Sequence, residues 1–267
     1  MRIYIDPGHG GADPGAQGNG LNEKDVTLDI ALRLQAILSN DYENVEIKMS
    51  RTSDITKNLN QRTSEANSWA ADYYLSIHIN SAGSTAQGYE DYIYNGLSDS
   101  SLTARYQDII HAEVVKVNGL RDRGTKKANF HVLRETAMSA LLTENGFISN
   151  PQEAALMDQA SWRQRVAQGH ANGLAIAFNL KRKPAPPPPT PGTLYKVIVG
   201  SFQSRENADE RVAALKARGF EAFVDTVVIS GAAWYRAQAG AFSDRANAEQ
   251  RVEDIKQAGF PEVFIAV

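Results

Sequence analysis

The sequence predicts an α/β domain with a mostly parallel, twisted sheet and flanking helices, followed by a small α+β module. Three observations lead to this prediction. Strand-like and helix-like segments alternate over residues 1–180, prolines gather at 181–192, and residues 193–267 contain an internal repeat. Alternating strands and helices are typical of parallel sheets, because parallel strands are usually joined by a helical crossover.

In the first domain, short apolar runs indicate strands, and apolar residues at helical spacing indicate helices. We expect strands at 2–5, 45–49, 73–78, 89–94, 131–134 and 141–144. We expect helices at 24–39, 58–71, 102–117 and 162–178. The basic stretch at 121–127 is expected to be a solvated loop, and contact with an anionic polymer is the alternative interpretation.

Residues 181–192 hold six of the ten prolines of the chain. Such a stretch excludes a helix or a central strand and favours extended polyproline II, at about 3.1 Å per residue. We therefore expect a semi-rigid spacer between a domain at 1–180 and a domain at 193–267. A polyproline ligand for an SH3-type partner is the alternative interpretation.

The C-terminal segment repeats itself. A shift of 40 residues superposes its two halves, with 12 identities in the 33 positions from 195 to 227. The first copy predicts a strand at 195–200, a helix at 207–218 and a strand at 221–228. Two such copies predict a ferredoxin-like module, in which both helices lie on one face of a single sheet.

Within this repeat, Gly-Ser-Phe at 200–202 matches Gly-Ala-Phe at 240–242, and the segment resembles the SPOR domains of bacterial cell-wall proteins. The resemblance implies binding to peptidoglycan, in particular to glycan strands without stem peptides. We expect Tyr195, Tyr235 and Gln238 on a sheet face that contacts sugar. The two phenylalanines of the repeat are expected in the core.

Composition excludes several classes of function. The chain has no cysteine, which excludes disulfides, a catalytic thiol and thiolate metal sites. A net charge of -3 and a pI of about 6.0 argue against nucleic-acid binding. No apolar run reaches the roughly 20 residues of a membrane span. The N-terminal residues lack the features of a secretory signal, so we expect synthesis in the cytoplasm; a mature form whose signal was removed is the alternative interpretation.

Four polar residues lie where predicted strands end or helices begin. His9 follows the first strand, His78 and Glu144 end later strands, and Glu23 begins the first helix. The carboxyl ends of parallel strands share one edge of a sheet, so these side chains should converge. Two histidines and a carboxylate form catalytic zinc sites, and a second carboxylate can then carry protons. The alternative, a phosphate cradle in the Gly-rich loop 8–20, lacks the P-loop and dinucleotide motifs.

Five ordered blocks of the first domain resemble the zinc-dependent N-acetylmuramoyl-L-alanine amidases, the amidase_3 family. They are DPGHGGADPGA at 6–16, NEK at 22–24, RTSD at 51–54, SIHIN at 76–80 and LTENGFISN at 142–150. The resemblance implies that His9, Glu23 and His78 bind one zinc ion and that Glu144 is the catalytic acid/base. It also implies hydrolysis of the amide between the lactyl group of N-acetylmuramic acid and L-alanine in peptidoglycan.

With its C-terminal repeat, the whole chain resembles the mother-cell-lysis amidases of spore-forming bacteria, which also lack a signal peptide. Asn80 and His131 are further expected substrate contacts. We find no extra helix between residues 78 and 144 that could cover the zinc, so we expect no obligatory protein partner.

Three other functions remain open at this point. A zinc peptidase or deacetylase on the same polymer would use the same metal site. A wall-binding protein with an inactive first domain would use only the C-terminal module. A phage lysin would share both domains and the chemistry.

Overall fold

The computed structural model describes residues 1–184, 194–229 and 231–267, and the chain divides into two compact units, Met1–Pro184 and Ala185–Val267. Residues 185–193 of the Pro-rich segment lie outside the described residues, so the polyproline spacer stays a prediction. Backbone hydrogen bonds attach residues 181–183 to the end of helix α1 (Glu23–Asp41) and the loop that follows it. The Glu43 amide donates to the Lys181 carbonyl at 2.8 Å, and the Lys183 amide donates to the Asp41 carbonyl at 2.7 Å.

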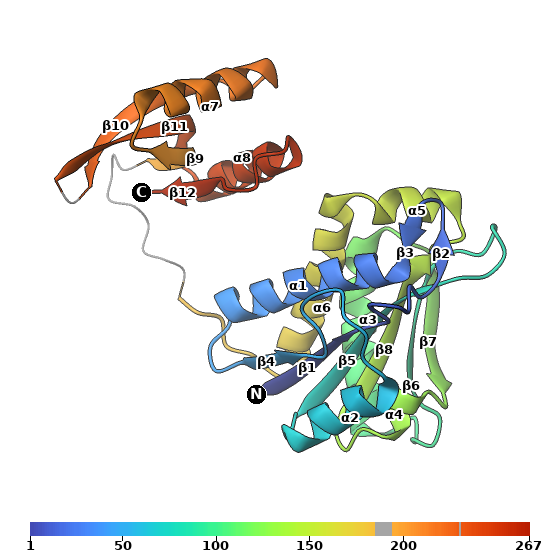
Figure 1. The fold of residues 1–267 in the computed structure, drawn as a ribbon. Helices are drawn as coiled ribbons and strands as arrows, with labels where there is room; N and C mark the ends of the chain where they lie inside the picture. Colours follow the sequence, from blue (N-terminus) through green and yellow to red (C-terminus); the bar gives the residue numbers. More distant parts are fainter. Residues whose placement is uncertain (185–193, 230) are drawn as a thin grey trace. The chain divides into compact units, whose positions relative to one another are not determined.

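The first unit alternates strands and helices, as predicted (Figure 1). Its strands are β1 (Arg2–Pro7), β2 (Gln17–Gly18), β3 (Leu21–Asn22), β4 (Glu46–Met49), β5 (Tyr73–Asn80), β6 (Tyr89–Tyr94), β7 (Asp122–Ala128) and β8 (Ser139–Phe147). Its helices are α1 (Glu23–Asp41), α2 (Leu59–Ser68), α3 (Leu102–Asn118), α4 (His131–Arg134), α5 (Pro151–Met157) and α6 (Ala160–Ala177).

Six of these strands form one sheet in the order β4-β1-β5-β8-β6-β7. β4, β1, β5 and β8 are parallel, whereas β6 is antiparallel to β8 and parallel to β7. The carboxyl ends of β1, β5 and β8 therefore meet at one edge of the sheet. The α/β fold with a mostly parallel sheet is confirmed.

Helices cover both faces of this sheet. Alternate residues of β1 show the division, because Ile3 and Ile5 pack in the large core with α1, α3 and α6, while Tyr4 packs in the smaller core with α2 and α4. In Figure 1 these two helix groups lie on opposite sides of the sheet. A sheet that is covered on both faces buries successive residues of its strands, and β1 and β5 are buried over most of their length.

The prediction of a strand at 131–134 is wrong, because these residues form the short helix α4. The carbonyl of Phe130 accepts the amides of both Leu133 and Arg134 at 3.1 Å, which closes a helical turn. Val132 and Leu133 are adjacent in sequence and both buried in the smaller core. A strand would have placed these two side chains on opposite faces.

The prediction of a solvated loop at 121–127 is also wrong, because this stretch contains the edge strand β7. Arg123 Nε donates to Glu90 at 2.5 Å, and Lys126 pairs with the same carboxylate. These contacts join residues more than 30 positions apart. The composition of the strand is polar, so its own pattern gives no strand signal.

The second unit contains β9 (Tyr195–Phe202), α7 (Arg205–Ala217), β10 (Phe223–Ile229), β11 (Ala232–Phe242), α8 (Arg245–Gln257) and β12 (Phe264–Ala266). The strands form an antiparallel sheet in the order β10-β11-β9-β12, with the helices packed on one face. This confirms the ferredoxin-like module that the repeat predicts.

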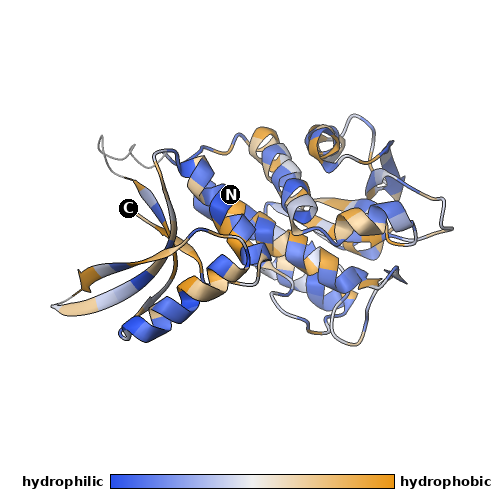
Figure 2. Cartoon of the chain, turned by 90° about the horizontal axis from the view of Figure 1, so that it is seen from above, coloured by the Kyte–Doolittle hydropathy of each residue, from blue (hydrophilic) through white to orange (hydrophobic). Residues whose placement is uncertain are grey.

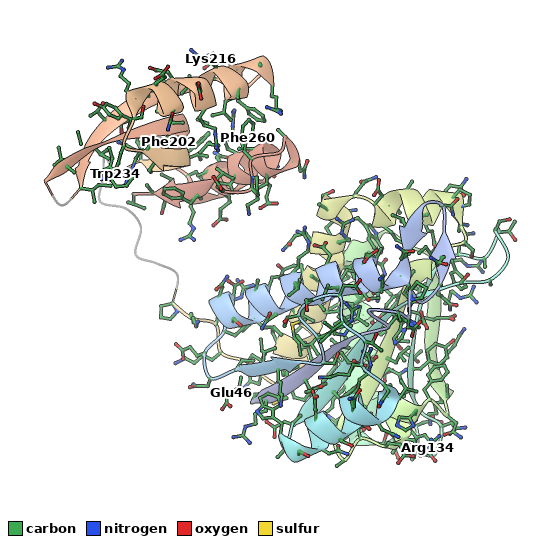
Figure 3. All side chains as sticks on the ribbon, viewed as in Figure 1. Glu46, Arg134, Phe202, Lys216, Trp234 and Phe260 are labelled. Atoms are coloured by element: carbon green, nitrogen blue, oxygen red, sulfur yellow. The ribbon has the colours of Figure 1, made fainter. Side chains whose placement is uncertain are left out.

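The two repeats are joined by equivalent cation–π contacts. Arg211 lies over Phe202 of its own repeat and over Phe260 of the other, at 5.5 and 5.7 Å (Figure 3). Arg251, at the equivalent position, contacts Phe242 and Phe220, both at 5.9 Å. Each arginine thus contacts rings from both copies.

Figure 2 shows polar and apolar residues alternating along the helices, as expected when one helical face packs on a sheet. Among the described residues, no helix combines the length and the hydrophobicity that a membrane crossing requires.

Candidate active site

Three of the four expected side chains come together at the carboxyl edge of the large sheet. His9 follows β1, Glu23 begins α1, and His78 lies near the end of β5. One ligand atom of each lies within 4.8 Å of the other two. β1 and β5 are parallel neighbours, so their ends bring the two histidines together. The three side chains form a candidate metal centre.

Glu23 lies between the two histidines. Its Oε2 is 3.1 Å from His9 Nε2, and its Oε1 is 2.8 Å from His78 Nδ1. The amides of Ala16 and Ile79 donate to the same carboxylate at 2.8 and 3.0 Å. Burial alone would raise the pKa of Glu23, but the hydrogen bonds to the histidines lower it well below its ordinary value. Glu23 is therefore ionised, as a carboxylate ligand must be.

Two glycines leave space for these side chains. A Cβ on Gly8 would lie 2.4 Å from the His78 ring, and a Cβ on Gly15 would lie 2.6 Å from both Glu23 Oε2 and the His9 ring. His9 itself has φ 61°, a left-handed conformation that is uncommon for residues with a side chain. The loop from 8 to 15 is thus shaped around the three candidate ligands.

Two buried arginines hold the backbone of this loop. Arg62 donates to the His9 carbonyl at 2.6 Å and pairs with buried Asp6 at 2.7 Å. Arg51 donates to the Gly8 carbonyl at 2.8 Å. Removing one partner of such a buried pair typically costs about 3–5 kcal/mol. The arginines therefore stabilise the unusual backbone of His9.

Asp13 orients the His9 ring, and sequence reasoning missed it. Its Oδ2 lies 2.8 Å from His9 Nδ1, and its Oδ1 accepts the Gly15 amide at 3.0 Å. A carboxylate only accepts, so His9 Nδ1 carries the proton of this bond, and Nε2 faces Glu23. An outer carboxylate of this kind fixes a histidine ligand and raises its basicity. The spacing of four residues from His9, within the Gly-rich loop, is the signal that could have identified it.

A cavity of about 540 Å³ lies beside the candidate metal centre. His9, His78, Glu144 and His131 line it. Its other walls include residues at the start of α2, at the start of α4 and on β8, among them Lys57, Asn58, Leu59, Arg62, Phe130, Val132 and Leu142. The side chains of His9 and His78 are 26% and 20% exposed, so solvent and substrate can reach the two histidines.

Glu144 brings a carboxyl group into this cavity. It pairs in register with His78 across β5 and β8. Among the described residues, its buried Oε2 has no hydrogen-bond partner. Burial raises the pKa of Glu144 well above its ordinary value, and the negative charges of Glu23 and Glu90 add to the shift. A carboxyl group with a raised pKa is suited to carrying protons near neutral pH.

Comparisons with known proteins agree with this geometry. Residues 3–175 match the family model of the N-acetylmuramoyl-L-alanine amidases, and residues 191–266 match that of the SPOR domain. The chain belongs to the N-acetylmuramoyl-L-alanine amidase family. The resemblance noted in the sequence is thereby confirmed. Members of this family are generally zinc-dependent, which fits the two histidines and the carboxylate of the candidate centre.

Relatives match most of the chain. The N-acetylmuramoyl-L-alanine amidase CwlM of Bacillus licheniformis is 53% identical over 224 residues, which cover 84% of each protein. The sporulation-specific N-acetylmuramoyl-L-alanine amidase of Bacillus subtilis strain 168 is 51% identical over 224 residues, again 84% of each. The catalytic domain of the amidase CwlV from Bacillus (Paenibacillus) polymyxa var. colistinus superposes with a TM-score of 0.64 at 36% identity, covering 67% of this chain and 99% of that domain.

The two expected substrate contacts of the amidase domain lie in different places. His131 lines the cavity, and its buried Nε2 has no partner among the described residues. Asn80 is not among the residues that line the cavity. Its Nδ2 donates to Glu90 Oε1 at 2.8 Å, so one of its donors is already used.

The expectation that three residues of the SPOR domain share one sheet face is wrong. Tyr195 is 8% exposed and packs in the core with the helices, and Tyr235 pairs with Phe202, which packs against the same core. Gln238 pairs with Ile198 on the opposite face. Side chains alternate along a strand, and residues paired across a ladder share a face, so register decides these positions.

The helix-free face of the SPOR sheet carries a row of side chains that sequence reasoning missed. Phe223, Gln238, Ile198 and Phe264 pair successively across all four strands. Phe223 and Phe264 are 54% and 43% exposed. The Oε1 of Gln238 is buried and has no hydrogen-bond partner among the described residues. Two exposed rings therefore flank a polar group at the centre of this face.

Proposed function

We propose that this chain binds one zinc ion through His9, Glu23 and His78 and hydrolyses the amide between the lactyl group of N-acetylmuramic acid and L-alanine. The main support for this proposal is the position of the Glu23 carboxylate. Its Oε2 lies 3.1 Å from His9 Nε2 and its Oε1 lies 2.8 Å from His78 Nδ1, and Glu144 lines the cavity beside them. Two histidines and a carboxylate, with a further position left open, are a donor set of catalytic zinc sites.

Glu144 is the proton carrier in this proposal. Bound zinc supplies Lewis acidity toward the scissile carbonyl and toward water. The Glu144 carboxylate takes the proton of the attacking water and gives it to the nitrogen of L-alanine as that amine leaves. Its Oε2 is free for this task because no described residue bonds to it.

Substrate would enter the cavity between the start of α2 and the segment before α4. Leu59 and Phe130 are 52% and 39% exposed at these two places and offer apolar surface. His131 lies next to Phe130 and offers a ring nitrogen to the polar backbone of a stem peptide. Asn80 is a more remote candidate, because its amide is bonded to Glu90.

The SPOR domain supplies wall binding. We assign glycan strands without stem peptides to its helix-free face, where exposed Phe223 and Phe264 flank Gln238. Sugar rings present apolar faces and hydroxyl groups, so aromatic rings beside an amide offer complementary contacts. The similarity to a sporulation-specific amidase supports a role in lysis of the mother cell wall. The exposure of His9 and His78 supports an enzyme that needs no activating partner.

Mass spectrometry of purified peptidoglycan digested by the full chain tests the activity. Intact stem peptides that begin with L-alanine, and that disappear on zinc chelation, are the expected products. Cleaved stem peptides would indicate a peptidase, and deacetylated sugars a deacetylase. Wall that binds the protein without chemical change would indicate an inactive first domain.

A further inference from the structure

Three buried polar side chains form a series of hydrogen bonds from α6 to the backbone of His78. His170 on α6 and Thr143 and Asn145 on β8 are at most 1% exposed. Thr143 Oγ1 lies 3.2 Å from His170 Nε2 and 3.0 Å from Asn145 Nδ2. Asn145 Nδ2 also lies 3.1 Å from the carbonyl oxygen of His78. The proposed reaction uses none of these three side chains directly.

Each hydrogen bond in this series has a defined donor, and Asn145 donates on both of its sides, to Thr143 and to His78. His170 Nδ1 lies 2.8 Å from a backbone carbonyl of its own helix, so Nδ1 carries the proton. Burial lowers the pKa of His170 to about 4, so near pH 7 its Nε2 is an acceptor. Thr143 then donates its hydroxyl hydrogen to Nε2, because the next acceptor, the Ser76 carbonyl, is 3.4 Å away. The Thr143 oxygen accepts one amide hydrogen of Asn145, and the other is left for His78.

This series of hydrogen-bonded side chains ends at His78, where the ladder between β5 and β8 is irregular. His78 pairs with Glu144, but Asn80 pairs with Phe147, so β8 has one extra residue between these two pairs. The extra residue forms a β-bulge at Asn145 and the glycine after it, which has φ 90°. Bulges bend a strand and redirect neighbouring side chains, and they are common next to active sites. The Asn145 amide therefore ties the irregular part of β8 to β5 at a candidate metal ligand.

We propose that Thr143, Asn145 and His170 are positioning residues that fix His78 relative to Glu144. This inference rests on the proposed function, because it takes His78 as a zinc ligand and Glu144 as the proton carrier. Thr143 and Asn145 flank Glu144 on β8, and their side chains lie on the opposite face of the sheet. They act on the site through the backbone.

The test compares Thr143→Val, which is nearly isosteric, with Thr143→Ser, which keeps the hydroxyl, both in the full chain. We expect the zinc dissociation constant of metal-stripped Thr143→Val, measured by competition with a chromophoric chelator, to rise about tenfold, as for other partners of metal ligands. We expect kcat on a soluble muropeptide to fall while KM stays unchanged. Thr143→Ser should restore both quantities.

Ser139→Ala is the matched control. Ser139 lies at the other end of β8, and its Oγ is 2.9 Å from Oγ1 of Thr103 on α3. The variant therefore loses a hydroxyl hydrogen bond far from His78. It should keep the zinc affinity and kcat of the unmodified chain. If Thr143→Val lowers the melting temperature as Ser139→Ala does but keeps zinc affinity and kcat, its role is only structural and the proposal is overturned.

His170→Leu breaks the same series of hydrogen bonds at α6. This variant also provides a test if Thr143→Val does not fold. An apolar side chain of suitable size fills the buried space without a new unpaired group on α6. We expect weaker zinc binding and lower kcat again, and unchanged values would overturn the proposal. A failure of the proposed function itself is distinguishable, because the unmodified chain would then bind no zinc stoichiometrically.

Discussion

Glu90 lies directly opposite Glu144 on the antiparallel ladder of β6 and β8, so the two carboxyl groups share one face of the sheet. Glu90 is 3% exposed and accepts hydrogen bonds from Arg123 at 2.5 Å and Tyr92 at 2.7 Å, with Lys126 paired to the same carboxylate. Burial alone would raise the pKa of Glu90, but these partners lower it. A permanent negative charge thus lies beside Glu144.

Replacing Glu90 by Gln should shift the acid side of the pH–activity profile to lower pH. The substitution removes a negative charge that raises the pKa of Glu144. Glu144 must be deprotonated to accept a proton from water, so a lower pKa keeps it active in more acidic solution. The measurement is kcat/KM as a function of pH, with Glu113→Gln on α3 as the control. An unchanged profile, or a shift to higher pH, contradicts this role of Glu90.

Replacing Glu144 by Ala should abolish turnover while zinc stays bound. General acid–base catalysis typically contributes about 10²–10⁴-fold, and the three candidate ligands are untouched. Metal analysis of the purified variant, together with release of stem peptides, checks both parts. Loss of zinc from Glu144→Ala would mean that Glu144 is a metal ligand rather than the proton carrier.

Replacing Asp13 by Asn should weaken zinc binding about tenfold, the lower end of the range for partners of metal-bound histidines. The amide oxygen can still accept from His9 Nδ1, but the negative charge that polarises the ring is lost. Chelator competition measures the change. Asp54→Asn is the control, because Asp54 bonds Gly11 and Lys24 in the same region without touching a candidate ligand. Equal zinc affinities in the two variants would refute the orienting role.

His170 should make the fold less stable in acid. Burial lowers its pKa from 6.5 to about 4. Between these values the unfolded chain takes up a proton that the folded chain does not, so the free energy of unfolding falls as pH drops from about 6.5 to about 4. The full effect is about 3 kcal/mol. Urea unfolding of the wild type and of His170→Leu at several pH values tests this, and parallel losses of stability in both would exclude His170 as the cause.

Replacing Phe264 by Ala should weaken binding to glycan strands without stem peptides about tenfold, equivalent to about 1.4 kcal/mol. Phe264 is 43% exposed on the helix-free face, so its removal leaves the core of the SPOR domain intact. Cosedimentation with such glycan measures the change. Lys216→Ala is the control, because Lys216 lies on α7, which packs on the other face of the sheet (Figure 3). Equal loss of binding in both variants would place the glycan elsewhere.

The sequence predicted much of the fold because most elements carry a local pattern. The apolar runs of β1 and β5 and the helical spacing of α1 place His9, His78 and Glu23 at strand and helix ends. Parallel topology then brings those ends to one edge of the sheet. The repeat in the second unit predicted the ferredoxin-like module, because two equal units build one sheet.

The features that the sequence did not predict depend on contacts between distant residues. β7 is polar, and Arg123 pairs with Glu90, 33 positions away. α4 is only four residues long, too short for a helical pattern. Tyr195 was placed on the wrong face because only the register of the four strands shows that it packs with the helices.

Zinc titration into the metal-stripped full chain, with release of L-alanine amino termini from peptidoglycan recorded at each step, measures whether amide hydrolysis depends on one bound zinc ion. We expect activity to rise with zinc and to reach its plateau at one equivalent per chain, and we expect His78→Ala neither to bind zinc stoichiometrically nor to release stem peptides. Full activity in the stripped chain, or unchanged activity in His78→Ala, would contradict this expectation.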